Sequence, residues 1–134
     1  MVSEATLISC TNAKRDHESP ARMLYDESTY FRKMRAWAES RPGRWYILSA
    51  KHGLLPPDEP VAPYNERGLS KEQARQIAFE LDERAIGRVY VCAGRDYLDP
   101  LEPALEEVYV DVLDPFDGMR IGERMKKLGE LVDA

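Results

Sequence analysis

Cysteine and histidine are scarce in this 134-residue sequence, which limits the kinds of site that it can build. The two cysteines, Cys10 and Cys92, make neither a disulfide framework nor a CxxC metal pair. Each ends an apolar stretch, where a buried thiol packs as a small hydrophobic side chain. With only two histidines, His17 and His52, a zinc site is not expected, and we predict no bound metal.

Long apolar runs and the common cofactor loops are also missing. No apolar stretch approaches the roughly 20 residues that cross a bilayer. The first residues include Glu4 and no basic cluster, so we expect no signal peptide, no membrane partner and a cytoplasmic protein. The absence of GxxxxGKS/T, GxGxxG and GxSxG loops leaves triphosphate binding, dinucleotide binding and a nucleophile-elbow hydrolase without a motif. We predict no cofactor and no obligate protein partner.

Basic residues are not in excess. The formal net charge is −5, which argues against a protein that coats nucleic acid through a generally basic surface. The charge is uneven, because residues 1–52 carry nine Lys or Arg against six Asp or Glu, whereas residues 53–134 carry ten against eighteen. An anionic partner is expected to meet the N-terminal half, although ordinary surface variation accounts for the asymmetry equally well.

What the sequence does contain is a regular alternation of strand and helix patterns. Strands are predicted at 6–10, 44–49, 88–93 and 108–113. Helices are predicted at 28–40 and 71–85, capped by Ser28 and Ser70, and residues 50–69 are predicted to be a long loop stiffened by proline. A third helix has the apolar stripe Leu98, Leu101, Leu105 and Val108, and a fourth, from about 119 to 132, is expected to bury Ile121, Met125, Leu128 and Leu131.

This alternation predicts an α/β fold. We expect residues 1–134 to form a single three-layer domain with a mostly parallel four-stranded sheet in βαβαβαβα order. Ligands of such sheets bind beyond the carboxyl ends of the strands. The sequence therefore directs attention to the residues that follow each strand.

Polar side chains gather at these strand ends. The first strand is followed by hydroxyl, basic and acidic residues, the second by Lys51 and His52, and the third by Arg95, Asp96 and Tyr97. Polar loops at three converging ends favour a crevice that handles an anion, although each alone is a common surface loop. A histidine after a strand is more often structural than catalytic, but Lys51 beside His52 would lower the histidine pKa and keep the ring neutral.

Several stretches together resemble a known family. LISCTNAKRD, ARMLYDESTYFRKMRAWAE, WYILSAKHGLLPPDE, PYNE, AG-x-x-Y and IGERM are similar, in this order, to small YaaA-like domains of unknown function. The wider group is similar to the peroxide-stress protein YaaA and to a domain of archaeosine synthase. This resemblance implies an α/β fold of the uracil-DNA glycosylase type and a connection to nucleobases, including excision of modified bases in phage defence. The water-activating and base-reading motifs of uracil-DNA glycosylases are not visible.

The resemblance and the strand-end residues together predict an enzyme that cleaves an N-glycosidic bond, most concretely a DNA glycosylase for a modified or damaged base. Such cleavage places negative charge on the departing base and positive charge on the sugar. The candidate catalytic residues are Lys51 and His52 for the base, and Asp16, Asp96 and Glu123 for the sugar or the attacking water. The candidate nucleic-acid-binding residues are Ser9, Thr11, Lys14, Arg15, Arg32, Ser49, Tyr64, Arg95 and Tyr97.

Two alternatives stay open for the same crevice. One is a module that binds a nucleotide, a modified base or DNA in a stress or phage response without chemistry. The other is a hydrolase or transferase of free nucleosides, which the acidic half of the chain favours, because like charge opposes a phosphate backbone. The three interpretations share one expectation, that Ser9, Lys14, Lys51, His52 and Tyr97 line one pocket.

Overall fold

The computed structural model describes residues 3–133. Its strands are β1 (Ser3–Ser9), β2 (Ser19–Pro20), β3 (Arg44–Ser49), β4 (Gly53–Leu55), β5 (Pro60–Val61), β6 (Ile86–Cys92) and β7 (Asp111–Leu113). Its helices are α1 (Ala21–Leu24), α2 (Thr29–Ser40), α3 (Lys71–Glu83), α4 (Arg95–Glu107) and α5 (Ile121–Asp133). Within these residues no helix has the length and apolar character that crossing a membrane requires.

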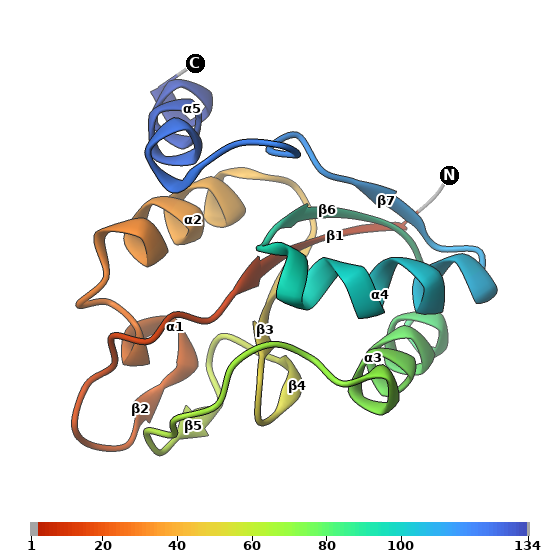
Figure 1. Cartoon of the computed structure of the whole chain (residues 1–134), viewed down its shortest axis with the longest axis horizontal. Helices are drawn as coiled ribbons and strands as arrows, with labels where there is room; N and C mark the ends of the chain where they lie inside the picture. Colours follow the sequence, from red (N-terminus) through yellow and green to blue (C-terminus); the bar gives the residue numbers. More distant parts are fainter. Residues whose placement is uncertain (1–2, 134) are drawn as a thin grey trace.

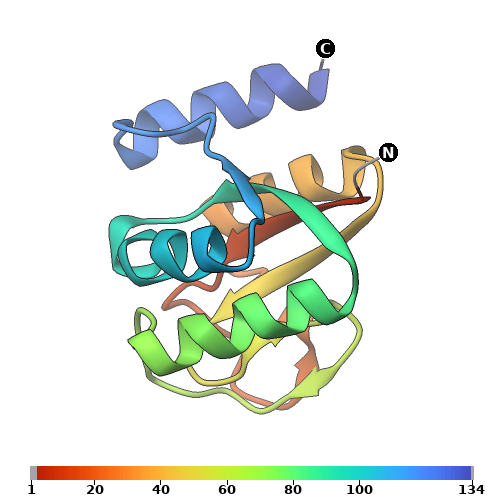
Figure 2. The ribbon, with the colours of Figure 1, turned by 90° about the vertical axis from the view of Figure 1, so that its right-hand side faces the viewer.

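A mixed five-stranded sheet forms the centre of the fold, in the order β4-β3-β1-β6-β7. Strands β3, β1, β6 and β7 are parallel, and β4 pairs antiparallel with β3. Helices α3 and α4 lie on one side of the sheet and α2 with α5 on the other (Figures 1 and 2). A separate pair, β2 and β5, is antiparallel. The predicted α/β class is confirmed, whereas the sheet has one strand more than predicted.

The central strands are buried on both faces, which explains their nearly continuous apolar sequences. In β1 every residue from Ala5 to Ser9 is buried, and the same holds for β3 from Tyr46 to Ser49. Parallel strands covered by helices on both faces have this pattern. The helix starts at Ser28 and Ser70 are confirmed, because each serine hydroxyl accepts a hydrogen bond from a backbone N–H of the first turn.

The extra strand changes the meaning of residues 50–69. The prediction of a loop throughout was wrong, because β3 turns back directly into β4 and Ser49 pairs with Gly53. Gly53 has φ +69°, a conformation that glycine adopts at little cost and that closes short hairpin turns. Lys51 and His52 lie in this turn and are exposed. The predicted strand at 44–49 is therefore followed by a hairpin turn, and not by a loop that borders a ligand crevice.

Two further elements differ from the prediction. The fourth parallel strand is only Asp111–Leu113, because α4 continues to Glu107 and the chain then turns at Tyr109 with φ +60°. On α5 the predicted buried residues Ile121 and Leu131 are 57% and 39% exposed. This helix packs on α2 and not on the sheet, so its covered stripe is narrow.

Candidate functional site

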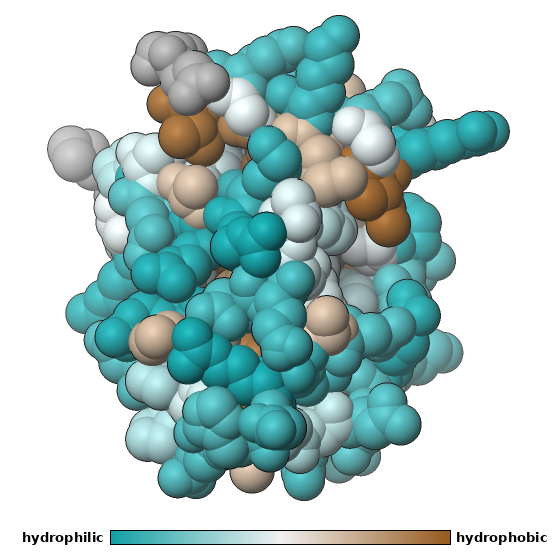
Figure 3. Space-filling model, turned by 90° about the vertical axis from the view of Figure 1, so that its left-hand side faces the viewer, coloured by the Kyte–Doolittle hydropathy of each residue, from teal (hydrophilic) through white to brown (hydrophobic). Residues whose placement is uncertain are grey.

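A cavity of about 500 Å³ lies beyond the carboxyl ends of β1 and β6. From these neighbouring strands the chain crosses in opposite directions, to β3 on one side and to β7 on the other. This is the switch point at which open α/β sheets bind ligands. The strand ends point to the left in Figure 1 and toward the viewer in Figure 3, where the face is mostly hydrophilic and hydrophobic side chains gather near its upper edge.

Three arginines from two parts of the chain line the cavity: Arg67, Arg120 and Arg124. Arg124 is only 7% exposed, and its Nε and Nη1 each donate at 3.0 Å, to the carbonyls of Met119 and Ala93. No carboxylate in the described residues lies within 4 Å of its guanidinium. A buried cation that donates to neutral carbonyls and has no carboxylate in direct contact favours an anion in the space beside it.

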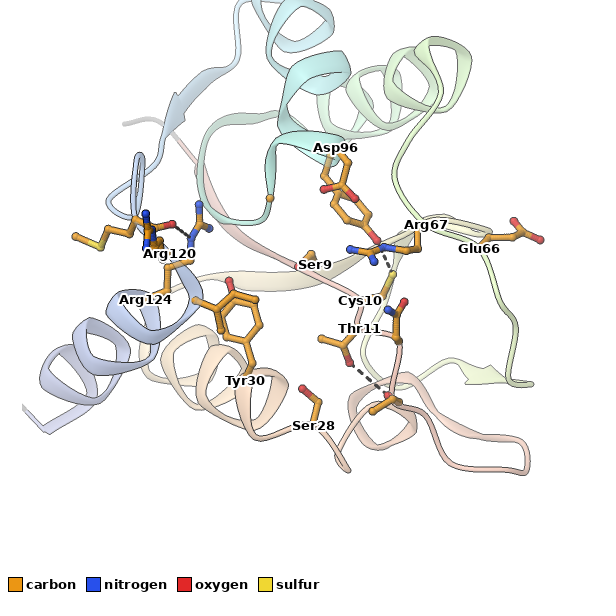
Figure 4. Close-up of a pocket in the computed structure, with 16 residues that line it drawn as sticks. Ser9, Cys10, Thr11, Ser28, Tyr30, Glu66, Arg67, Asp96, Arg120 and Arg124 are labelled. Atoms are coloured by element: carbon orange, nitrogen blue, oxygen red, sulfur yellow. Dashed lines mark hydrogen bonds between the residues drawn. The ribbon is translucent and has the colours of Figure 1, made fainter.

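A carboxylate lies across the cavity from two of these cations. Asp96 is in the first turn of α4, is exposed to the cavity, and has no cation within 4 Å among residues 3–133. Gly94 lies two residues before Asp96, and a Cβ on residue 94 would lie 2.9 Å from Asp96 Oδ1. Glycine therefore leaves room for the carboxylate. In Figure 4, Arg120 and Arg124 lie on one side of the cavity, Arg67 and Asp96 lie on the opposite side, and Ser9 is between them.

Two tyrosines complete the walls. The hydroxyl of Tyr97 is 3.1 Å from Cys10 Sγ, and that of Tyr30 is 3.4 Å from Cys92 Sγ. Burial raises the pKa of both tyrosines above the ordinary value. Both phenols are therefore protonated at neutral pH and act as hydrogen-bonding or packing groups, not as bases.

The structure brings some of the predicted site residues together in this cavity. Ser9, Thr11, Asp96 and Tyr97 line it. They come from the end of β1 and the start of α4, which are adjacent because β1 and β6 pair side by side. The topological rule located this part of the site without any knowledge of side-chain positions.

Lys51 and His52 do not line the cavity, and Lys14 also lies outside it, so the expected pocket of Ser9, Lys14, Lys51, His52 and Tyr97 is not formed. Lys51 and His52 are exposed in the β3–β4 turn, where their backbone N–H groups donate to Ser49 Oγ. The ring of His52 lies edge-on to Tyr64, with 5.5 Å between centroids. Their placement follows from the antiparallel strand β4, which the sequence pattern did not reveal.

Ser49, Tyr64 and Lys14 also lie outside the cavity, in a neighbouring cluster. Ser49 Oγ donates to the Tyr64 hydroxyl at 2.8 Å, and the hydroxyls of Tyr64 and Tyr25 share a hydrogen bond of 2.5 Å. Lys14 Nζ is 4.8 Å from the centroid of the Tyr64 ring. Burial raises the pKa of Tyr25 and Tyr64 and lowers that of Lys14. Tyr64 is thus fixed in the core and has no face free for stacking.

The other predicted residues are engaged elsewhere. Arg15 makes a two-pronged contact with Asp26, and Arg32 donates to the Asp26 carbonyl and to Thr29. Asp16 is paired with His17 on the surface, and Glu123 accepts the backbone N–H of Arg120 at the start of α5. Arg95 is paired with Asp99 and Glu102 and lines a separate acidic hollow that includes Asp114 and Asp117.

The lining residues missed from the sequence include the three arginines and a tyrosine: Arg67, Arg120, Arg124 and Tyr30. Arg124 had a usable signal, because it lies four residues before Leu128 on the apolar stripe of α5, where a cation is out of place. Arg67 had none, since it lies in an irregular segment. The described residues hold no group of three or more His, Cys, Asp or Glu that could bind a metal ion.

The comparisons with known proteins give a family without an activity. Residues 5–130 match the model of DUF6884, a family of unknown function. No curated protein and no solved structure matches the chain.

Proposed function

The chain belongs to this family of unknown function, and we propose that it is an enzyme that cleaves the N-glycosidic bond of a nucleotide, most concretely of a modified or damaged base in DNA. One observation carries the proposal: a carboxylate without a cation partner within 4 Å among the described residues faces Arg120 and Arg124 across a cavity at the switch point of the sheet, with Arg67 on its own side. The resemblance to YaaA-like domains supports the same function. On this proposal the protein acts in the cytoplasm, in a stress response or in phage defence.

The charges of the cavity match those that develop during the reaction. As the bond from C1′ to the base breaks, the sugar becomes cationic and the base anionic. Asp96 is the group that stabilises the sugar cation and takes a proton from the attacking water. The water oxygen bonds to C1′, and the base departs as an anion with the bonding electron pair while Arg120 and Arg124 bind it or the phosphate. The proton that Asp96 took from the water then passes to the base, which leaves Asp96 ionised again.

The size of the cavity suits one nucleotide. Small-ligand pockets occupy about 300–1,000 Å³, and this cavity is about 500 Å³. A base in DNA would have to leave the helical stack to enter it, at a cost of a few kcal/mol that is smallest for a damaged, mismatched or single-stranded base. Single-stranded or damaged DNA is therefore the substrate that the cavity favours.

Base release measures this activity directly. Oligonucleotides that carry a panel of modified bases are incubated with the protein, and free base and abasic sites are quantified by mass spectrometry. We expect the wild-type chain to release base, Asp96→Asn to lose at least about a hundredfold in rate, and Lys51→Ala to behave as wild type. If Lys51→Ala loses activity while Asp96→Asn retains it, the catalytic group is in the β3–β4 turn and not in the cavity. No release from any oligonucleotide would remove the enzymatic proposal.

A binding module without chemistry is the second candidate, and a specific observation favours it. No histidine lines the cavity among the described residues, and the two tyrosines are held protonated by burial, which leaves the carboxylates of Asp96 and Glu66 and the thiol of Cys10 as its acid–base groups. A module predicts that Asp96→Asn binds the same oligonucleotides as tightly as wild type, and that neither protein releases base. Fluorescence anisotropy on the same panel separates the two candidates.

A further inference from the structure

The segment of residues 64–69, here called the strap, carries Arg67 to the cavity. It lies between β5 and α3 and forms no helix or strand of its own. Arg67 has no side-chain partner among the described residues, yet Figure 4 shows it directed toward the cavity while the neighbouring Glu66 points away. An irregular exposed segment holds a side chain in place only if something else fixes its backbone.

The first anchor of the strap is Tyr64. Its side chain is 9% exposed, and its hydroxyl bonds to Ser49 Oγ at 2.8 Å and to the Tyr25 hydroxyl at 2.5 Å. Lys14 lies over one part of its ring and the His52 ring packs against it edge-on. Loss of the hydroxyl would leave buried partners unpaired, so the native position of Tyr64 is strongly preferred.

The second anchor is at the other end of the strap. The backbone N–H of Leu69 donates to the carbonyl of Asp96 at 3.1 Å. That carbonyl is free because Pro100, four residues later in α4, has no N–H to bond to it. Gly68 has φ +73°, and a Cβ there would lie 3.2 Å from the same carbonyl. The strap is therefore tied to the backbone of Asp96, the proposed catalytic residue.

These two anchors point to a division of labour. We infer that Arg67 binds the phosphate or another anionic group of the ligand, and that Tyr64 is a positioning residue that holds Arg67 there without touching the ligand. The identity of the ligand in this inference rests on the proposed function, whereas the anchoring of Arg67 by Tyr64 does not depend on it. The inference also gives the hairpin residues Ser49 and His52 a supporting role. They contact Tyr64 and so help to hold the strap, and they do not contact the ligand themselves.

Spin labelling tests the anchoring without any ligand. A nitroxide is attached at position 66 through Glu66→Cys, since Glu66 is exposed and the native Cys10 and Cys92 are 6% and 0% exposed. We expect Tyr64→Phe to sharpen the electron paramagnetic resonance spectrum, because the strap gains mobility. The matched control is Tyr46→Phe, a buried tyrosine whose hydroxyl has no partner in the described residues. An unchanged spectrum in Tyr64→Phe overturns the anchoring.

A double-mutant cycle tests whether Tyr64 acts through Arg67. The probes are the four 2′-deoxynucleoside 5′-monophosphates, with binding measured by calorimetry. We expect Arg67→Ala to weaken binding about tenfold or more, Tyr64→Phe to weaken it by less, and Arg67→Lys to retain part of the affinity. Tyr64→Phe is expected to have no further effect when combined with Arg67→Ala.

The outcomes separate the two proposals. If the losses of the two single variants multiply in the double variant, Tyr64 does not act through Arg67 and the inference is wrong. If Arg67→Ala binds as wild type does, Arg67 is not a ligand residue and the inference is also wrong. If none of the four monophosphates binds to the wild-type chain, the ligand assignment falls with the proposed function, and the spin-label comparison alone decides the anchoring.

Discussion

The buried tyrosines make this protein sensitive to alkali. Burial raises the pKa of Tyr25, Tyr30, Tyr64 and Tyr97 above the ordinary value near 10. The phenol proton is therefore retained in the folded chain at a pH where the unfolded chain has lost it. The free energy of unfolding that these groups contribute is fully present below pH ~10 and is lost as the pH rises toward the folded pKa values.

The magnitude follows from counting retained protons. A group that is protonated in the folded state but ionised in the unfolded state lowers the free energy of unfolding by about 1.4 kcal/mol for each unit of rising pH. Four such tyrosines give a slope that approaches about 5 kcal/mol per pH unit roughly one unit above pH ~10. Cys92, whose pKa is also raised by burial, starts the decline from pH ~9. Lys14, whose pKa burial lowers, acts in the opposite direction, but only below pH ~10.4.

Urea unfolding at pH 8.0, 9.5, 10.5 and 11.0 measures this slope. With a total stability of about 5–15 kcal/mol, we expect the wild-type chain to unfold without denaturant by about pH 11–12. Tyr97→Phe removes one titrating group and is expected to reduce the slope by about a quarter. The control is Tyr109→Phe, because Tyr109 is 91% exposed. A free energy of unfolding that stays constant from pH 8.0 to 11.0, or an equal effect of both substitutions, would refute the reasoning.

Three other substitutions test separate features. Gly68→Ala is expected to destabilise by about 1–2 kcal/mol in urea unfolding, because its φ of +73° penalises a Cβ, whereas Gly122→Ala, in α5 with open space around it, should be neutral or stabilising. Ser70→Ala should cost about 1 kcal/mol of thermal stability through loss of the capping box, and equal stability would show that the cap is dispensable. Arg124→Met should fold but bind nucleoside monophosphates about tenfold more weakly. The control is Arg95→Ala, because Arg95 lies outside the cavity, and it should bind as wild type does. Equal affinity of the two variants would show that Arg124 does not bind the ligand.

Much of the fold was predictable because its signals are local. The apolar runs of β1, β3 and β6, the serine caps of α2 and α3, and the alternation of elements each depend on neighbouring residues. From these, the rule for parallel sheets led to Ser9, Asp96 and Tyr97 at the cavity. The α/β class and one side of the candidate site follow from periodicity and topology alone.

The errors came from one very short strand and from contacts between distant residues. The hairpin at Lys51 and His52 depends on a three-residue strand that is too short for its period to be recognised. Arg67 reaches the cavity because Tyr64 is bonded to Ser49, fifteen positions earlier, and because a proline in α4 frees a carbonyl. Neither pairing leaves a mark on the local pattern.

The sequence by itself determined the class of the fold, the central parallel strands and the edge of the sheet where a ligand would bind, since hydrophobic periods and helix caps act over a few residues. Tertiary structure alone decided which side chains meet there. It placed Asp96 opposite Arg120 and Arg124, and it left Lys51 and His52 outside the lining of the cavity. Charges interact through space, so their partners depend on how distant elements pack and not on their order along the chain.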